Sequence, residues 1–425
     1  MIWSIDNLLN DLNNISIPSE SEFRDAIPKI ISNIESNEEK LRETMSEETG
    51  MTTLASQKEI ERTITSIETC LRIKCAPTEI VESDIPGSRL EIHHVPLGVI
   101  GIITPFNHPL NIPVQAILPA LAVGNRVLWK AAHQCPKSSQ LLTDLIRREG
   151  LPLIYGGSSV EVGQAIVESE IDGIVFVGGA AAGKDVAARC GIKKLVLELG
   201  GSDALLVLED LRSDEKRLSN AIDIAIQGRF ANSGQRCTST KRILVEETIS
   251  QQFVEPFVEK VKALPFGERK DALVGPLVSE ESAIFIEKMF QDALAKGAVA
   301  LVGGKREGRL VHPTVLVGVT PEMMIAREEC FGPVASIMTF SGNDEAVRLT
   351  NDSTFGLTAA IMTGDRQRAL ELSGRLRCGG VIINGPTGLR AEWMPFGGFK
   401  ESGYGRMGAV YLARELTTIK TILEC

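Results

Sequence analysis

The chain has 425 residues, of which 43% are hydrophobic and 24% charged, and its formal net charge is −10. This length exceeds what one hydrophobic core usually serves, so two or three domains are expected. The negative charge disfavours nucleic acid or an anionic membrane as the main partner.

No apolar run approaches the roughly 20 residues that span a bilayer. The first residues, "MIWSIDNLLNDLNN", lack the basic start and apolar core of a signal peptide. We therefore expect a cytoplasmic protein. The eight cysteines and five histidines form neither a Cys-x-x-Cys pair nor a Cys/His cluster, so neither a disulfide framework nor a metal site is expected.

The chain begins with helical periodicity. Apolar side chains recur from Phe23 to Met45 and again from Ile60 to Leu71, with Gly50 between the two runs. Ser19 or Ser21 is a candidate cap for the first helical segment. Residues 79–95, "EIVESDIPGSRLEIHHV", alternate on either side of a Pro-Gly pair and predict a β-hairpin.

Short apolar runs then alternate with amphipathic helical stretches. The runs lie at 98–104, 126–130, 173–178 and 194–201, helical patterns follow at 110–123, 137–149 and 181–190, and the alternation continues from about 219 to 408. This order predicts an α/β fold with mainly parallel sheets and helices on both faces. The last segment alternates like a strand and would expose an edge unless another strand pairs with it.

Two glycine-rich stretches are candidates for a dinucleotide site. The pattern Gly-x-Gly-x-x-Gly occurs at 403–408, but only 17 residues follow, so no βαβ unit can complete it. We predict that these glycines serve turns and close backbone approach. In "GIVFVGGAAAGKDVA" an apolar strand ends at Gly178-Gly179 directly before a helix, whose N-terminus can receive a phosphate. An ordinary strand–helix turn is the alternative.

Three polar side chains stand out in otherwise apolar surroundings. Glu198 ends the strand in "LELGGSD", where it is either an ion-paired acid or a carboxylate held in a cleft at the carboxyl end of a sheet. Asn107 in "TPFNHPLN" could donate to an oxyanion or cap the next helix. Cys237 in "NSGQRCTSTKR" is either a reactive thiol or a packing residue.

The ordered set of segments resembles the aldehyde dehydrogenase superfamily over nearly the whole chain. The matching pieces are "PLGVIGIITPFNHPLN", "LPALAVGNRVLWK", "FVGGAAAGK", "LELGG", "NSGQRCTSTKR", "HPTVL", "EECFGPV", "NDSTFGL" and "MPFGGFKESGYGR". The resemblance implies a modified Rossmann cofactor domain (1–77 and 97–199) and an α/β catalytic domain (200–408). It also implies a small β oligomerisation element (78–96 and 409–425), and hence a homodimer or homotetramer.

The resemblance also implies a catalytic mechanism. Cys237 would attack the aldehyde carbon to form a thiohemiacetal, and Asn107 with the backbone N–H of Cys237 would form the oxyanion hole. Hydride transfer would leave a thioester, for whose hydrolysis Glu198 would activate water.

On the cofactor side, Lys130 resembles the lysine that reaches the adenosine ribose. Glu329 resembles the carboxylate that holds the nicotinamide ribose, and Phe331 packs near the nicotinamide. The other cofactor residues that the resemblance implies are Thr104, Pro105, Phe106, Gly178 and Gly179.

The chain departs from the family pattern on this side at two places. It has Gly178-Gly179 where relatives often have Gly-Ser, and His133 where NAD-preferring relatives often carry an acid three residues after the lysine. Because an acid there would repel a 2′-phosphate, we expect NADP or NAD as cofactor, with NADP slightly favoured.

Arg236, Arg390 and His108 are the candidate substrate residues. Two guanidiniums near the site could hold a carboxylate or phosphate, or each could be ion-paired within the fold. "TGLRAEWMPFGG" resembles the branch that handles lactaldehyde, glyceraldehyde or its phosphate, and semialdehydes. The rival readings are a reductase or CoA-acylating member similar to glutamyl-phosphate reductase, and a non-catalytic protein on the same scaffold.

Overall fold

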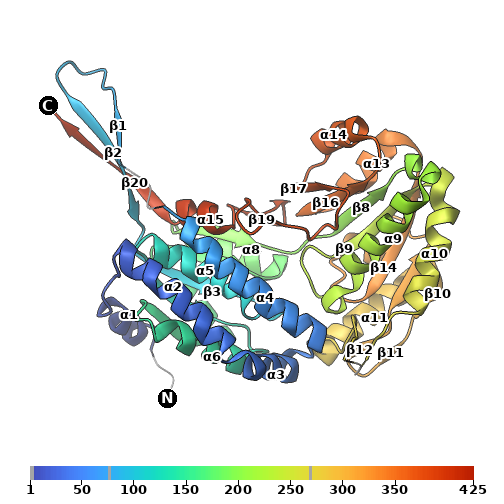
Figure 1. Ribbon diagram of the computed structural model, residues 1–425, viewed down its shortest axis with the longest axis horizontal. Coiled ribbons are helices and arrows are strands. Elements are labelled where there is room, and N and C mark those ends of the chain that lie inside the picture. Colours follow the sequence, from blue (N-terminus) through green and yellow to red (C-terminus); the bar gives the residue numbers. More distant parts are fainter. Residues whose placement is uncertain (1–3, 75–77, 268–269) are drawn as a thin grey trace.

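The computed structural model describes residues 4–74, 78–267 and 270–425 (Figure 1). Two sheets with helices on their faces form the body of the molecule, and a small antiparallel sheet projects from it beside the C-terminus. The predicted α/β class is confirmed, because both large sheets are mainly parallel.

The N-terminal part is helical. It comprises α1 (Ile5–Asn13), α2 (Glu20–Glu35), α3 (Glu38–Thr49) and α4 (Thr53–Thr69). Ser19 caps α2, since its side chain accepts from the Glu22 N–H and the Glu22 carboxylate accepts from the Ser19 N–H at 2.8 Å. The first predicted helical segment is in fact broken between α2 and α3, where the Asn37 amide donates to the Asn33 carbonyl at 2.8 Å. Helix α1 was not predicted from the sequence.

The first sheet has six strands in the order β19-β7-β6-β3-β4-β5. They are β3 (Val99–Ile103), β4 (Arg126–Lys130), β5 (Leu153–Gly157), β6 (Gly173–Val177), β7 (Lys194–Glu198) and β19 (Gly403–Tyr404). The helices of this part are α5 (Asn111–Ala122), α6 (Pro136–Arg147), α7 (Val160–Glu168) and α8 (Ala180–Arg189). One apolar core joins the sheet to α2–α6, and a second joins it to α1, α7 and α8.

The strand order of this sheet fixes where a ligand can bind. From β3 the chain moves outward through β4 and β5, and it then returns to the other side of β3 for β6 and β7. The order therefore reverses between β3 and β6, and a crevice opens outside the carboxyl ends of strands at such a point. Residues 104–107 and Gly178-Gly179 follow those two strands.

The second sheet has seven strands in the order β10-β13-β14-β9-β8-β16-β17. They are β8 (Asp203–Val207), β9 (Thr240–Glu246), β10 (Val299–Val302), β13 (Thr314–Val317), β14 (Val334–Phe340), β16 (Thr358–Met362) and β17 (Gly380–Ile383). Its helices are α9 (Glu215–Phe230), α10 (Ser250–Lys262), α11 (Glu280–Ala295), α12 (Met324–Arg327), α13 (Gly342–Asn351) and α14 (Arg366–Arg375). Separate apolar cores lie on the two faces of this sheet.

The projecting sheet has the order β1-β2-β20 and is antiparallel (Figure 1). It consists of β1 (Glu79–Val81), β2 (Arg89–Pro96) and β20 (Thr417–Glu424), so the predicted hairpin is confirmed and the C-terminal strand pairs with it. The remaining short strands are β11 (Arg306–Glu307), β12 (Leu310–Val311), β15 (Phe355–Gly356) and β18 (Phe399–Lys400).

Two C-terminal segments contact the first sheet and its core. β19, predicted within the catalytic domain, pairs with β7 in the first sheet. This approach depends on Gly403, whose φ is +139° and whose missing Cβ would lie 2.1 Å from the Leu197 carbonyl oxygen. α15 (Ala409–Glu415), predicted within the oligomerisation element, packs on α5 instead because its apolar face completes the first core. The domain limits stay a prediction.

Candidate active site

Cys237 lies between a tight turn and strand β9. The turn, Ala231–Gly234, contains left-handed backbone at Asn232 and Ser233, with φ of 52° and 57°. Buried Arg229 braces it by donating to the carbonyl of Gly234 at 3.2 Å and to the carbonyl of Gly332. The half-buried thiol is therefore presented from a fixed loop.

Glu198 is the last residue of β7. It pairs in register with Val177 of β6 and, on the other side, with Gly403 of β19. Its carboxylate is buried, and neither oxygen has a hydrogen-bond partner within the described residues. Burial raises the pKa of Glu198 well above its ordinary value, although the charge of Arg390 opposes the shift. An unpartnered buried carboxyl of this kind is costly for folding, which favours a functional role.

The Cys237 thiol is held in its neutral form in this state of the protein. Burial raises its pKa to about 12, and the nearby Glu198 carboxyl adds to the shift. Lys241 acts in the opposite direction. Reactivity therefore requires a change in solvation or charge in the site, because the thiolate is the attacking species.

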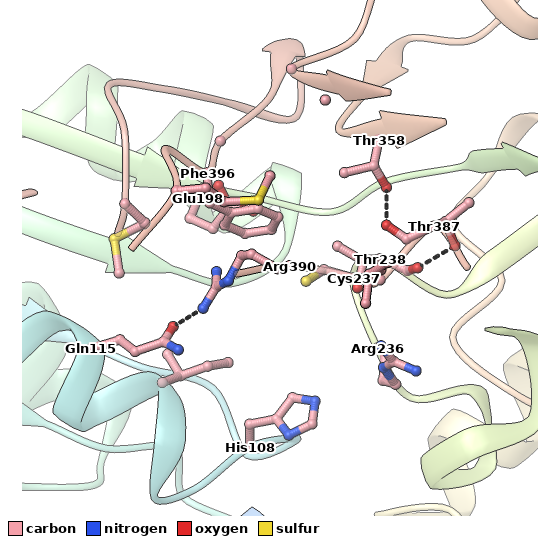
Figure 2. A pocket seen from close by; sticks show the side chains of 18 of the residues that line it. His108, Gln115, Glu198, Arg236, Cys237, Thr238, Thr358, Thr387, Arg390 and Phe396 are labelled. Carbon is pink, nitrogen blue, oxygen red and sulfur yellow. Dashed lines mark hydrogen bonds between the residues drawn. The ribbon is translucent and has the colours of Figure 1, made fainter. Parts of the chain in front are cut away.

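Two cavities meet at these side chains. Cys237 and Glu198 line both of them, together with Val177 and Ile112. One cavity lies on the side of the 104–107 loop, and we call it the cofactor-side cavity. The other, the substrate-side cavity, lies toward Arg236 and Arg390, and Figure 2 shows the Cys237 sulfur pointing across it toward Arg390.

Asn107 lies beside the nucleophile loop. It is buried, and one N–H of its side-chain amide donates to the Gln235 carbonyl at 3.1 Å. Its own backbone carbonyl accepts from the Asn232 amide at 2.9 Å. The side chain lines the cofactor-side cavity next to Cys237, so its second N–H is available to a group bound there.

Most of the predicted cofactor residues line the cofactor-side cavity. The rings of Phe106 and Phe331 meet edge to face at 6.1 Å. Glu329 accepts from the Gly201 N–H at 3.2 Å and packs so closely on Gly200 that a Cβ there would lie 2.2 Å from its Oε2. The predicted residues in this lining are Pro105, Phe106, Gly178, Gly179, Glu329 and Phe331.

This cavity fits a dinucleotide. Gly179 is the N-cap residue of α8, it makes no side-chain cap, and a Cβ there would meet no atom within 4 Å. The first turn of α8 therefore has no side-chain cap from Gly179 and there is open space at this residue, and a phosphate can accept from the N–H groups of such a helix N-terminus. Glu329 provides a carboxylate for ribose hydroxyls, and the two phenylalanines provide an apolar wall.

Three predicted cofactor residues lie outside the lining of this cavity. Lys130 ends β4, and burial lowers the pKa of its ammonium. His133 is exposed three residues further on. The Thr104 hydroxyl accepts from the Trp129 indole at 2.9 Å, so the structure assigns it a packing contact.

The substrate-side cavity is lined by cations. Arg236 has no ion pair with a carboxylate in the described part of the chain. Burial lowers the pKa of Arg236 to about 10, with a contribution from Arg62, and it remains a cation at neutral pH. Arg390 donates to Gln115 at 2.5 Å and pairs with Glu392 at 3.3 Å, whereas His108 lies 2.6 Å from buried Glu59.

Two cations near Cys237, Arg62 and Lys241, were not predicted from the sequence. Arg62 comes from α4, lines the same cavity and pairs with Glu392 at 3.3 Å. Lys241 is fully buried and pairs with Glu329 at 3.1 Å. Lys241 could have been noticed in the sequence, because it begins the apolar run "KRILVE". A lysine in a buried strand requires a partner for its charge, so it is a candidate for a site residue. Arg62 gave no such signal, since it lies on a helix with other charged residues.

The described residues contain neither a candidate metal site nor a helix that could span a membrane. Within the described ranges, no group of three or more His, Cys, Asp or Glu side chains could hold a metal ion. Among the helices described, none has the length and apolar character needed to cross a bilayer.

Comparison with known proteins gives consistent matches. The model of the aldehyde dehydrogenase family matches residues 19–422. The lactaldehyde dehydrogenase of Methanococcus aeolicus is 33% identical over 93% of this chain and 86% of its own length. The sulfoacetaldehyde dehydrogenase of Neptuniibacter caesariensis is 34% identical over 93% of this chain and 88% of its own length.

A solved structure shows the same fold. The glyceraldehyde-3-phosphate dehydrogenase of Methanocaldococcus jannaschii, complexed with NADP, superposes with a TM-score of 0.92. It is 32% identical in sequence, and the match covers 99% of this chain and 93% of that one.

Proposed function

The chain belongs to the aldehyde dehydrogenase family, and we propose that it oxidises a small aldehyde bearing an anionic group to the carboxylic acid. It is an NAD(P)-dependent oxidoreductase. The substrate and the residue roles given below are our proposal.

The unpaired guanidinium of Arg236 carries the proposal for an anionic substrate. It lines the substrate-side cavity with Arg62, Arg390 and His108, while the only carboxylate in that lining within the described chain is Glu198. Arg62 and Arg390 share the carboxylate of Glu392, whereas Arg236 has no carboxylate partner in the described chain. An oxoanion on the substrate would supply the missing countercharge. The aldehydes named for two relatives carry a sulfonate or a phosphate group.

In the proposed mechanism the Cys237 thiolate adds to the aldehyde carbon. The carbonyl electron pair moves onto oxygen, where the Asn107 amide and the Cys237 N–H stabilise the charge. As the oxygen electron pair re-forms the carbonyl, the aldehyde carbon loses its hydride, for which a nicotinamide dinucleotide would supply the acceptor when bound, and a thioester to Cys237 remains. Glu198 then takes a proton from a water molecule, whose oxygen attacks the thioester and releases the acid and Cys237.

For the cofactor we propose contacts at three places. Glu329 holds the nicotinamide ribose, the N-terminus of α8 at Gly179 receives the pyrophosphate, and Lys130 reaches the adenosine ribose. His133 leaves the ribose 2′ position without a repelling acid, which supports a slight preference for NADP.

We also propose that the chain forms a homodimer or homotetramer through its projecting sheet. β20 is an edge strand of that sheet, and the two outer strands carry exposed apolar side chains. These include Ile80, Ile419, Ile422 and Leu423. An apolar edge of this kind requires a covering partner. Light scattering on the full chain tests the oligomeric state.

The function is tested with an aldehyde panel assayed with NAD and NADP, using Cys237→Ala as control. The panel pairs anionic aldehydes, such as sulfoacetaldehyde, with neutral aldehydes of similar size. We expect a higher kcat/KM for the anionic members and no turnover in the variant. Equal kcat/KM for both classes would reject the anionic substrate, and full turnover by the variant would reject the thioester route. Turnover that requires added CoA would favour the acylating alternative.

A further inference from the structure

Lys241 is a buried cation directly behind the nucleophile. It is the second residue of β9, and its side chain is fully inaccessible to solvent. Its ammonium donates to the Arg236 carbonyl at 3.0 Å, to the Cys237 carbonyl, and to Glu329 Oε1 at 3.1 Å. All three donors of the ammonium are therefore used, and two of them serve the backbone of the nucleophile loop.

The contact between Lys241 and the Arg236 carbonyl determines the direction in which the Cys237 N–H points. The Arg236 carbonyl and the Cys237 N–H belong to one planar trans peptide, in which the C=O and N–H bonds point in opposite directions. The same carbonyl also accepts from the Ser239 N–H at 3.1 Å. With its oxygen held from one side by Lys241 and Ser239, the peptide keeps its N–H turned away from them.

The charge of Lys241 adds a second effect. A cation that donates to a carbonyl oxygen polarises the whole peptide, and this makes the N–H at its other end a stronger donor. Because the ammonium is fully buried, water does not screen its charge from the peptide oxygen.

Lys241 also joins the nucleophile loop to the cofactor side of the site. Its partner Glu329 accepts from the Gly201 N–H as well, through the same Oε1. The ammonium thus connects three backbone regions, at Gly201, at Glu329 and at 236–237.

We propose that Lys241 is a positioning residue that holds and polarises the Arg236–Cys237 peptide, so that the Cys237 N–H can stabilise the oxyanion formed on attack at a carbonyl. The inference rests on the proposed role of Cys237 as nucleophile. It goes beyond that role because Lys241, which touches no substrate, would strengthen stabilisation of the oxyanion by the Cys237 N–H.

Comparing two reactions of the Cys237 thiolate distinguishes an effect of Lys241 on the oxyanion from an effect on ionisation of the thiol. In acylation by 4-nitrophenyl acetate, sulfur adds to the carbonyl carbon, an oxyanion forms, and its collapse expels 4-nitrophenolate. In alkylation by iodoacetamide, sulfur displaces iodide from a methylene carbon and no oxyanion forms. Both rates scale with the fraction of thiolate, so their ratio at one pH isolates stabilisation of the oxyanion.

The experiment measures this ratio for Lys241→Met in the cofactor-free full-length chain. Cys425 is exposed, so all proteins carry Cys425→Ser, and the rates of a Cys237→Ala protein are subtracted. The matched control is Lys262→Met, which removes an exposed lysine on α10. Thermal unfolding checks that each variant is folded. If the methionine variant does not fold, Lys241→Gln is used, since it also withdraws the charge.

We expect the ratio of acylation to alkylation to fall about tenfold or more in the Lys241 variant, somewhat less than the roughly 100- to 1000-fold loss when an oxyanion donor is removed outright. The Lys262 variant should keep the wild-type ratio. An unchanged ratio in a folded Lys241 variant would overturn the inference while leaving the proposed function intact. If Cys237→Ala does not lower either rate of the parent protein, the proposed nucleophile itself is wrong.

Discussion

Glu198 and Cys237 both line the substrate-side and the cofactor-side cavity, so the two side chains stand at the boundary where these spaces meet. They come from different sheets, since Glu198 ends β7 and Cys237 precedes β9. A carbon bound to the sulfur is therefore open to the cofactor-side cavity and is also within the surroundings of the carboxyl group. In the proposed mechanism, this placement gives a carbon bound to Cys237 access to both the cofactor-side cavity and the carboxyl group of Glu198.

Replacement of Glu198 by Gln should separate the two halves of the reaction. Attack by Cys237 does not require the carboxylate, so the burst of NAD(P)H in the first turnover should persist. Steady-state turnover should fall about 100- to 10,000-fold, the range that a general base contributes. Stopped-flow absorbance measures both phases, and mass spectrometry should find the acyl group on Cys237. Loss of the burst together with turnover would show that Glu198 acts before the thioester forms.

The raised pKa of Glu198 predicts how turnover depends on pH. As a base, this group must be ionised, and burial shifts its ionisation well above the usual glutamate range. Where hydrolysis limits the rate, kcat should therefore rise with pH through this shifted pKa. Because the Arg390 cation favours the carboxylate, Arg390→Met should move the rise to higher pH. The profile is measured as kcat at saturating aldehyde. The same rise in Glu198→Gln would assign it to another group.

The sequence predicted much of this site because parallel strands end at a common edge. Glu198 ends one strand of the first sheet and Gly178 follows the neighbouring parallel strand. The predicted parallel sheet therefore already places both residues at the same edge. Assigning Cys237 its role needed the ordered set of motifs, because its own segment is equally compatible with a packing residue.

The charge pairing could not be predicted from local patterns. Arg236 and Arg390 looked equivalent in sequence, yet Arg390 is paired with Glu392 and Gln115 whereas Arg236 has no carboxylate partner in the described ranges. Arg390 has its carboxylate two residues away, whereas its contact with Gln115 and the Arg62–Glu392 pair depend on packing of α4 and α5 against residues about 280 to 330 positions away. The break between α2 and α3 was missed for a different reason. The apolar side chains keep their helical spacing across the break, so the sequence pattern does not show that the helix ends there.

Removal of the Arg236 charge should weaken binding of anionic aldehydes. Hydrogen bonds to charged groups are worth about 1.5–3 kcal/mol, so Arg236→Met should raise KM for an anionic aldehyde about ten- to hundredfold. KM for a neutral aldehyde should change little. The matched control is Arg348→Met, which removes an exposed arginine on α13. An equal rise in KM for both aldehydes would indicate a general distortion of the cavity.

His133 should influence the choice between the two dinucleotides. His133→Glu places a negative charge three residues after Lys130, where it can accept from a ribose 2′-hydroxyl but repels a 2′-phosphate. We expect the ratio of kcat/KM for NADP to that for NAD to fall roughly tenfold, as one unfavourable charge contact near a surface costs on the order of 1–4 kcal/mol. His133→Gln, of similar size and without charge, is the control. An unchanged ratio would place the 2′ position away from this residue.

Gly388 offers a test of the anion site that leaves Arg236 in place. A Cβ at Gly388 would lie 2.1 Å from Arg236 Nη2 and 2.9 Å from Thr238 Oγ1. Since the first contact is the end of a flexible side chain, Gly388→Ala should displace the guanidinium at little expense of stability. KM for an anionic aldehyde should then rise as in Arg236→Met, and combining the two substitutions should add little, because both act on one contact. Steady-state kinetics with a thermal unfolding control measures this. Full additivity of the two changes in KM would show that Gly388 acts on binding by a route other than Arg236.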